Sequence, residues 1–335
     1  MRPLAASLDI GGTLAKIALL TDAEQPSPLG THGERNLSFR IETATNRYDV
    51  HFGWWYTVDV QELVYFLKAL GVTNLAVAGG GAHRFDEQLK SAFSVVKVDE
   101  IGASARGLAF LFDYSMVNRE PFFATVDPAT GEVRWEASSS PVFPFVLVTV
   151  GSGVSIIKIL SPVDYERVSG TCIGGGTALG LAHCLLGVDS FDGLIELAEK
   201  GSGVLDLTAG ESSSVIFPPD TLACSFGRIF EMTNVDRASV AWSVLHMVAN
   251  NLGYLTHLVA QVHGCSKIYF GGKFVHQHPP TMASVTKGVT FAEKHYCNTK
   301  KPDPIEAFFI KHDGYLGAIG ALLHMSPVLL SQTLR

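Results

Sequence analysis

The 335-residue sequence has little charge and no cluster of basic residues. Only 17% of its residues are Asp, Glu, Lys or Arg, and the formal net charge is −7. A protein that binds a nucleic-acid backbone or an anionic membrane neutralises phosphates with grouped Lys and Arg side chains. We therefore expect neither a nucleic acid nor a membrane to be the main partner.

Paired cysteines and long apolar runs are also missing. The five cysteines are odd in number and show no CxxC spacing, which argues against a disulfide framework and a zinc site. This usage is typical of a reducing compartment, so we expect a cytoplasmic protein. The longest apolar stretches fall well short of the roughly 20 residues of a membrane-spanning helix. Asp9 interrupts the N-terminal apolar segment, so no signal peptide is predicted.

What the sequence does have is enough apolar material for a large core. Hydrophobic residues make up 47% of the chain, and its length exceeds the ~100 to 200 residues of one typical domain. Val58–Leu70 has apolar residues at helical spacing and is followed by Gly71, which predicts a crossover helix before a short buried strand, Leu75–Ala78. These features predict two lobes of α/β type.

The stretch AASLDIGGTLAKIALL, residues 5–20, predicts a β-hairpin that turns on Gly11 and Gly12. Glycine supplies positive φ or a missing Cβ at such a turn. Backbone amides around Gly11, Gly12 and Thr13 can point at phosphate oxygens, Lys16 adds a positive charge, and Asp9 can hold a hydrated Mg²⁺. The pattern fits a nucleoside triphosphate site, and it also fits a plain tight hairpin with a charged strand end.

A second hairpin of the same design is predicted over Phe145–Leu160, where the turn is GSGVS. Two such hairpins are what a duplicated kinase needs, because each half grips the phosphates from one side. The segment GGGTALG, residues 174–180, opens a predicted helix whose N-terminus could face an anion.

Asp99 and Glu100 follow a predicted strand, Val95–Val98, and precede a predicted helix, Ala103–Phe112. A carboxylate at such a junction either complements the helix N-terminus or serves as a catalytic base, and the sequence leaves both possibilities open.

Four segments of the second half complete the prediction. Arg237–Val262 can form one long helix, which packs either within its lobe or on another subunit. Small residues in the predicted helix His312–Met325 would allow close packing at a hinge between the lobes. Residues 276–303 show no pattern and are predicted to be a variable loop. Ser266–Phe270 is a predicted strand that ends at Gly271 and Gly272, where an adenine ring would pass close to the backbone.

Together these motifs make the chain similar to the eukaryotic-type (type II) pantothenate kinase family of the actin-like ATPase and sugar kinase superfamily. The resemblance covers nearly the whole chain, in family order, through DIGGTLAKI, AGGGAHRF, the DE of KVDEI, GSGVSI, RVSGTCIGGGTALGL, ACSFG, YFGGKFV and HDGYLGAIGALL. It implies the two-lobed actin-like ATPase fold with duplicated β-sheet cores and flanking helices, divided here into residues 1–144 and 145–335. It also implies MgATP-dependent phosphorylation of pantothenate, with acyl-CoA as an inhibitor.

The resemblance carries site residues with it. Glu100 resembles the general base of the family, and Ser152, Ser155 and Arg167 resemble its pantothenate-holding residues, with Arg167 suited to the pantothenate carboxylate. Asp9 would hold Mg²⁺ through water. The residues expected to bind ATP are Asp9, Gly11, Gly12, Thr13, Lys16, Gly151, Gly153, Gly271 and Gly272.

Departures and alternatives remain. Cys172 stands where the family usually has Ser, and residues 276–306 follow the family pattern poorly, which puts the acyl-CoA contacts in doubt. A sugar or N-acetylhexosamine kinase of the same superfamily would share the two hairpins. A non-catalytic partner subunit would share the fold, although retention of Glu100 and Arg167 argues against it. The expected assembly is a homodimer, or a heterodimer with a paralogue.

Overall fold

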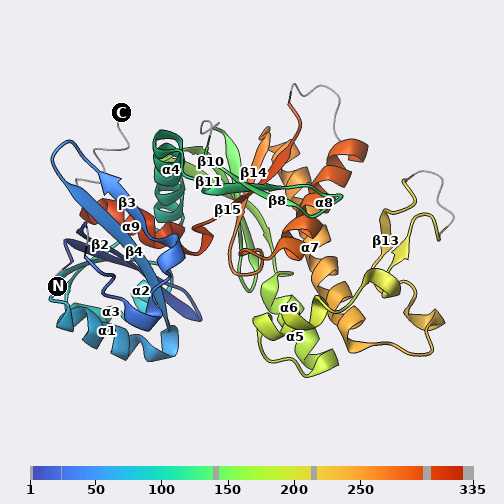
Figure 1. Ribbon diagram of the computed structural model, residues 1–335, viewed down its shortest axis with the longest axis horizontal. Helices are drawn as coiled ribbons and strands as arrows, with labels where there is room; N and C mark the ends of the chain where they lie inside the picture. Colours follow the sequence, from blue (N-terminus) through green and yellow to red (C-terminus); the bar gives the residue numbers. More distant parts are fainter. Residues whose placement is uncertain (1–2, 24, 139–142, 213–216, 297–302, 327–335) are drawn as a thin grey trace.

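The computed structural model describes residues 3–23, 25–138, 143–212, 217–296 and 303–326, and it contains two large β-sheets (Figure 1). The first has six strands in the order β3-β4-β2-β1-β5-β6. Its strands are β1 (Ala5–Ile10), β2 (Leu14–Asp22), β3 (Phe39–Glu42), β4 (Arg47–Tyr56), β5 (Asn74–Ala78) and β6 (Ser94–Lys97). The predicted first hairpin is the antiparallel pair of β1 and β2, and β1 pairs in parallel with β5 on its other side.

The second sheet has seven strands in the order β11-β10-β9-β14-β15-β7-β8. They are β7 (Phe123–Val126), β8 (Val133–Glu136), β9 (Phe145–Val150), β10 (Val154–Ser161), β11 (Asp164–Thr171), β14 (Lys267–Gly271) and β15 (Glu306–Ile310). The predicted second hairpin is the pair of β9 and β10. A separate small ribbon pairs β12 (Leu207–Thr208) with β13 (Leu222–Cys224).

Nine α-helices are present in the described part of the chain. They are α1 (Val60–Ala69), α2 (Gly81–Arg84), α3 (Asp86–Lys90), α4 (Glu100–Asn118), α5 (Gly175–Leu186), α6 (Phe191–Ala198), α7 (Arg237–Val262), α8 (Pro279–Tyr296) and α9 (Leu316–Met325). The long α7 has the predicted bounds, because an Asp236 side chain caps its first turn and an apolar face packs in the core. No single described helix has the length and apolarity to cross a membrane, whereas α5 and α6, bent by 69°, pass that test only as a pair.

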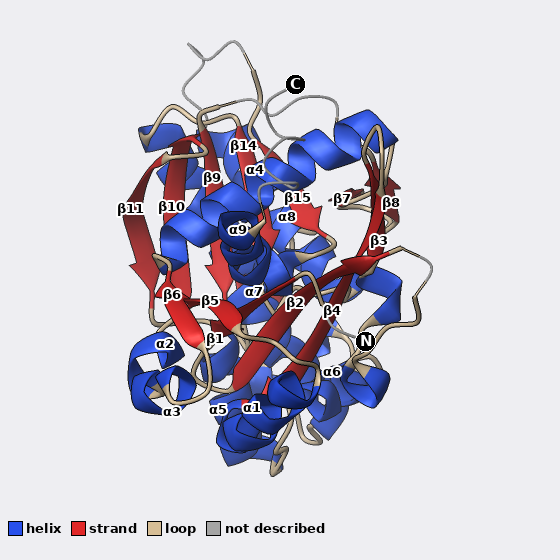
Figure 2. Cartoon of the chain, turned by 90° about the vertical axis from the view of Figure 1, so that its left-hand side faces the viewer, coloured by secondary structure: helices blue, strands red, loops and turns tan. Residues whose placement is uncertain are grey.

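The helices form three layers around the two sheets. Apolar residues of α1, α2 and α3 pack on one face of the first sheet. Residues of α4 and α9 pack between the two sheets, as Figure 2 shows from the side of the first sheet. Helices α5 to α8 cover the far face of the second sheet. Strand β9 shows the alternation, since Phe145 and Leu147 face the α4 side while Val146 and Val148 face the α7 side.

Strand membership does not follow the expected division at residue 144. Strands β7 and β8 precede that position but belong to the second sheet, where β7 pairs with β15. Helix α9 follows it but packs on β1, β5 and α4. The chain therefore crosses between the two halves more than once.

The predicted close packing of small residues is confirmed at the contact between α4 and α9. A Cβ atom at Gly320 would lie 1.8 Å from the carbonyl oxygen of Ala103, and one at Gly107 would lie 2.2 Å from the carbonyl oxygen of Leu316. The two helices can approach only because both positions are glycine. This contact holds α4, which begins at Glu100, against the first sheet.

The predicted loop over residues 276–303 is wrong for its central part, which forms α8. The helix begins at Pro279, a residue that fits the first turn because the missing N–H has no helical acceptor there. Its buried face includes Met282, Val285 and Val289, spaced three and four residues apart. Ser, Thr and Gly between them obscured the period, and residues 297–302 lie outside the described part of the chain.

Candidate active site

Asp9 lies at the end of β1, directly opposite Lys16 of β2. Its carboxylate fits between two glycines, since a Cβ at Gly79 would lie 2.7 Å from Oδ1 and one at Gly317 would lie 2.6 Å from Oδ2. Gly79 follows β5, and Gly317 lies in the first turn of α9. The carboxylate of β1 thus lies between the end of β5 and the first turn of α9, and only glycine at these two positions leaves room for it.

Burial raises the pKa of Asp9, and the positive charge of Lys16 opposes that shift. A carboxylate in this position favours a cation close by. Mg²⁺ is usually held by one or two carboxylates together with water and substrate phosphates. Within the described residues no group of three or more His, Cys, Asp or Glu forms a metal cage. A single buried carboxylate opposite Lys16, as at Asp9, is compatible with the water-mediated, phosphate-shared Mg²⁺ that its motif predicts.

The first hairpin turn presents free amides. Thr57 forms hydrogen bonds with two carbonyl oxygens of the turn. Its hydroxyl donates to the carbonyl of Gly11, and its backbone N–H donates to the carbonyl of Thr13. In the described part of the chain, no acceptor receives the amides of Gly12 and Thr13. Sequence reasoning missed Thr57, whose role depends on the pairing of β2 with β4.

The reason expected for glycine at this turn needs correction. Gly11 and Gly12 do not have positive φ, and a Cβ at Gly12 would meet no atom within 4 Å. The fold itself does not require glycine at residue 12. A group that approaches the exposed turn closely would require it.

The structure separates the roles of Asp99 and Glu100. Asp99 caps α4, which begins at Glu100 rather than at the expected Ala103, and Asp99 Oδ2 accepts the Gly102 amide at 2.7 Å. The same oxygen accepts the Tyr165 hydroxyl of β11 at 2.8 Å. Asp99 is thus committed to hydrogen bonds, while Glu100 makes none within the described residues.

Glu100 is electrostatically part of the Asp9 site. Partial burial and the negative charges of Asp9 and Asp99 raise the pKa of Glu100, and Lys16 opposes them. A carboxylate with a raised pKa, free of hydrogen bonds and exposed to an incoming molecule, has the properties of a general base.

The second hairpin also presents free amides, but a helix supports it. Gly175 and Gly176, at the start of α5, donate their amides to the carbonyls of Gly151 and Ser152 at 2.9 and 3.0 Å. The amides of Ser152 and Gly153 find no acceptor in the described chain. The expected anion site at the start of α5 is therefore not formed by these two amides, which the hairpin already uses.

Ser155 and Arg167 form a polar pair on neighbouring strands. Arg167 Nε donates to Ser155 Oγ at 2.9 Å, from β11 to β10. Both side chains belong to the strand pair that carries the second hairpin. The Arg167 guanidinium is exposed to solvent rather than buried. Its remaining N–H groups are accessible to an anionic ligand.

Tyr165 connects the two groups of predicted site residues. Asp9, Lys16 and Glu100 influence one another electrostatically on the side of the first sheet. The pair of Ser155 and Arg167 lies on the second sheet. Tyr165, two residues before Arg167 on β11, reaches Asp99, and Gly102 has no Cβ to obstruct it. Sequence reasoning did not detect Tyr165.

At the end of β14, the two predicted adenosine glycines meet a buried acid. Asp313 Oδ2 accepts the Gly272 amide at 2.9 Å, and a Cβ at Gly271 would lie 2.9 Å from Asp313 Cβ. Gly272 has φ of +105°, which favours glycine. No sequence signal singled out Asp313 within HDGYLGAIGALL.

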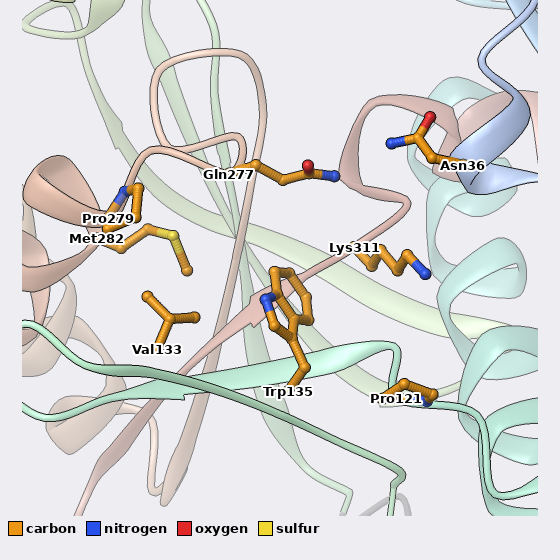
Figure 3. A pocket seen from close by; sticks show the side chains of 8 residues that line it. All are labelled: Asn36, Pro121, Val133, Trp135, Gln277, Pro279, Met282 and Lys311. Carbon is orange, nitrogen blue, oxygen red and sulfur yellow. The ribbon is translucent and has the colours of Figure 1, made fainter.

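A pocket of about 430 Å³ is lined by other residues than those of the predicted site (Figure 3). Trp135, Met282 and Val133 supply apolar walls, and Lys311, Gln277 and Asn36 bring polar groups towards it. None of the predicted catalytic or binding residues lines this pocket.

Several known proteins are similar to this chain in sequence. A pantothenate kinase of Schizosaccharomyces pombe is 30% identical over 348 residues, covering 95% of this chain and 81% of that protein. Pantothenate kinase 1 of Arabidopsis thaliana is 32% identical, covering 94% and 84%. A 4'-phosphopantetheine phosphatase of Mus musculus is 33% identical over 258 residues, but the chain spans only 30% of its length.

A solved structure shows the same fold. The ROK family glucokinase of Streptomyces griseus, in complex with glucose and AMPPNP, superposes with a TM-score of 0.50 at 12% identity, covering 96% of this chain and 98% of that one. This likeness confirms the fold class predicted from the motifs. The family model named Fumble matches residues 5–324. The chain therefore belongs to the Fumble family, the type II pantothenate kinases.

Proposed function

We propose that this protein is a pantothenate kinase, which uses ATP to phosphorylate the primary hydroxyl of pantothenate. The observation that carries the proposal is Glu100, an exposed carboxylate with a raised pKa and no hydrogen bond in the described chain, beside Asp9 and Lys16. A primary alcohol that attacks a γ-phosphoryl group needs a carboxylate that accepts its proton. Glu100 fills that role at the start of α4.

The two hairpins would divide the binding work. The free amides of Gly12 and Thr13, together with Lys16, face the phosphates of ATP, and the amides of Ser152 and Gly153 approach from the second sheet. Asp9 would hold Mg²⁺ through water. When bound, Mg²⁺ neutralises charge on the phosphate oxygens. Gly271 and Gly272 would lie along the adenosine.

Recognition of the acceptor rests on charge. Pantothenate carries a carboxylate, and Arg167 offers an exposed guanidinium that Ser155 orients. A guanidinium binds a carboxylate through two parallel hydrogen bonds. A neutral hexose would make no use of the charge of this exposed guanidinium, whereas the carboxylate of pantothenate would pair with it. We therefore favour pantothenate over a sugar acceptor.

Assembly, regulation and location are further parts of the proposal. We expect a dimer, homomeric or with a paralogue, in which the exposed part of α7 contributes to the contact. Light scattering should then give twice the 36.0 kDa chain mass.

Acyl-CoA is the expected inhibitor. Within the described residues Cys172, Cys184 and Cys224 are exposed thiols outside any disulfide, which supports a reducing cytoplasmic setting.

The proposal is tested by a coupled assay of ADP release with pantothenate against glucose and N-acetylglucosamine. We expect pantothenate-dependent turnover that Glu100→Gln abolishes. Turnover of a hexose without pantothenate turnover would establish the sugar kinase alternative. No turnover with any acceptor, with ATP binding intact, would establish a non-catalytic partner subunit.

A further inference from the structure

Asp313 is a buried acid that joins three backbone and side-chain donors. Its side chain is only 2% exposed. Oδ2 accepts the Gly272 amide at 2.9 Å, while Oδ1 accepts the Gly314 amide at 2.6 Å and a ring N–H of His276 at 2.7 Å. Hydrogen bonds to a buried carboxylate are among the strongest in proteins.

The three donors belong to parts of the chain with different tasks. Gly272 lies in the turn after β14, where the adenosine is expected. Gly314 lies in the short 3₁₀ helix Asp313–Tyr315 that leads into α9, the helix whose Gly317 adjoins Asp9. A Cβ at Gly314 would lie 3.6 Å from Lys16 Nζ, so the ammonium group of the phosphate-side lysine lies close to this corner.

From this geometry we propose that Asp313 is a positioning residue for ATP, which fixes the Gly271–Gly272 turn in register with Lys16 and the start of α9. The proposal rests on the ATP-dependent function above. Asp313 itself does not touch the nucleotide. Its carboxylate joins Gly272, Gly314 and His276 in one rigid junction. The adenosine and phosphate ends of the site therefore keep a fixed separation.

His276 makes the junction dependent on pH. Burial acts to lower the pKa of His276, but the hydrogen bond and charge of Asp313, with the charge of Glu34, raise it overall, while Lys16 opposes them. Lys311 and His312 are the other ionisable groups near Asp313. Burial lowers the pKa of His312 to about 4, so this ring is neutral at neutral pH. Protonated His276 therefore compensates the buried charge of Asp313, and this compensation is lost as the pH rises through the raised pKa.

The test uses direct titration of the full-length protein with MgATP, in the absence of any acceptor. Asp313→Asn keeps the size of the side chain but turns an N–H towards one of the three donors. We expect the Kd for ATP to rise about tenfold or more, and the KM for pantothenate to change much less. Because no acceptor is needed, the binding result stands even if pantothenate proves not to be the substrate.

A second variant keeps the proposal testable if Asp313→Asn does not fold. In the wild type, the Kd for ATP should rise as the pH increases through the raised pKa of His276. In His276→Gln this dependence should disappear, after subtraction of the titration of ATP itself in the same buffers. The control is His183→Gln, which removes an equally short but exposed contact with Asp189 on the outside of α5. It should keep the wild-type profile.

Two results would overturn the proposal. One is an unchanged Kd for ATP in a folded Asp313→Asn variant. The other is a pH dependence of ATP binding that is the same in His276→Gln as in the wild type. A lower melting temperature with unchanged nucleotide affinity would give Asp313 a role in stability alone.

Discussion

The two hairpins, β1–β2 and β9–β10, have the same design and different support. Each presents two amides at its turn that have no acceptor among the described residues, Gly12 and Thr13 in one and Ser152 and Gly153 in the other. Thr57 holds the carbonyls of the first turn, whereas the start of α5 holds those of the second.

Their surroundings differ in charge as well. The first hairpin carries Asp9 opposite Lys16 and lies near Glu100, so that charge is concentrated around its open turn. The second is flanked by apolar strand residues and by the polar pair of Ser155 and Arg167. The duplicated frame thus serves two tasks. We infer that the first hairpin, with Glu100 nearby, serves phosphate and proton chemistry, while the second adds its turn amides to the phosphates and also anchors a helix and the acceptor.

The largest expected effect comes from removing Glu100, the expected general base near the first hairpin. Glu100→Gln should lower kcat by about 10²- to 10⁴-fold, because a positioned general base contributes that much, while ATP binding persists. Steady-state kinetics with titration of ATP measures both. Asp99→Asn is the matched control, since Asn also caps a helix, and it should keep most of the activity. Near-normal turnover in Glu100→Gln would move the base elsewhere.

The next largest effect is a difference in the free energy of unfolding between substitutions at the two hairpin turns. Gly176→Ala places a Cβ 3.0 Å from the Ser152 carbonyl oxygen, and we expect a loss of about 1–3 kcal/mol in the free energy of unfolding. Gly12→Ala meets no atom and should leave stability nearly unchanged, while weakening ATP binding. Denaturant unfolding of both variants measures the contrast. Equal stability of the two variants would show that α5 does not anchor the second turn.

Much of this division was predictable from local sequence. Both hairpins follow from apolar runs that meet glycine turns, and the bounds of α7 follow from its long run of apolar residues. Helix α8 was missed because Ser, Thr and Gly on its buried face are not apolar, although close packing on α7 suits them.

The site was predictable in its residues but not in its connections. Asp99 and Glu100 are adjacent and chemically alike, and only the cap and the Tyr165 contact distinguish them. The roles of Thr57 and Asp313 depend on contacts between residues about 40 positions apart, for which the sequence carries no periodic signal.

A smaller effect concerns the connection between the two halves. Tyr165→Phe removes the hydroxyl that Asp99 accepts, which should cost about 0.5–1.5 kcal/mol, as for a typical hydrogen bond. If the contact sets the distance between Glu100 and the acceptor, kcat should fall several-fold with little change in either KM. A change in melting temperature alone would make the contact purely structural.

The smallest expected effect is a shift in the pH profile. A general base must be ionised, so activity should fall as the pH drops through the raised pKa of Glu100. Asp99→Asn removes a negative neighbour, which should lower that pKa and move the acid limb of kcat to lower pH. Lys16→Ala should move it to higher pH. An unmoved limb in both variants would separate Glu100 from the observed titration.

The most direct test of the division between the two hairpins is a crossed measurement of KM. Lys16→Ala should raise the KM for ATP about tenfold or more with little effect on pantothenate, because its ammonium lies at the phosphate turn. Arg167→Ala should raise the KM for pantothenate about tenfold, a value that allows for its exposure to solvent, with little effect on ATP or on a neutral pantothenamide. If both variants changed both KM values equally, the division of labour would be contradicted.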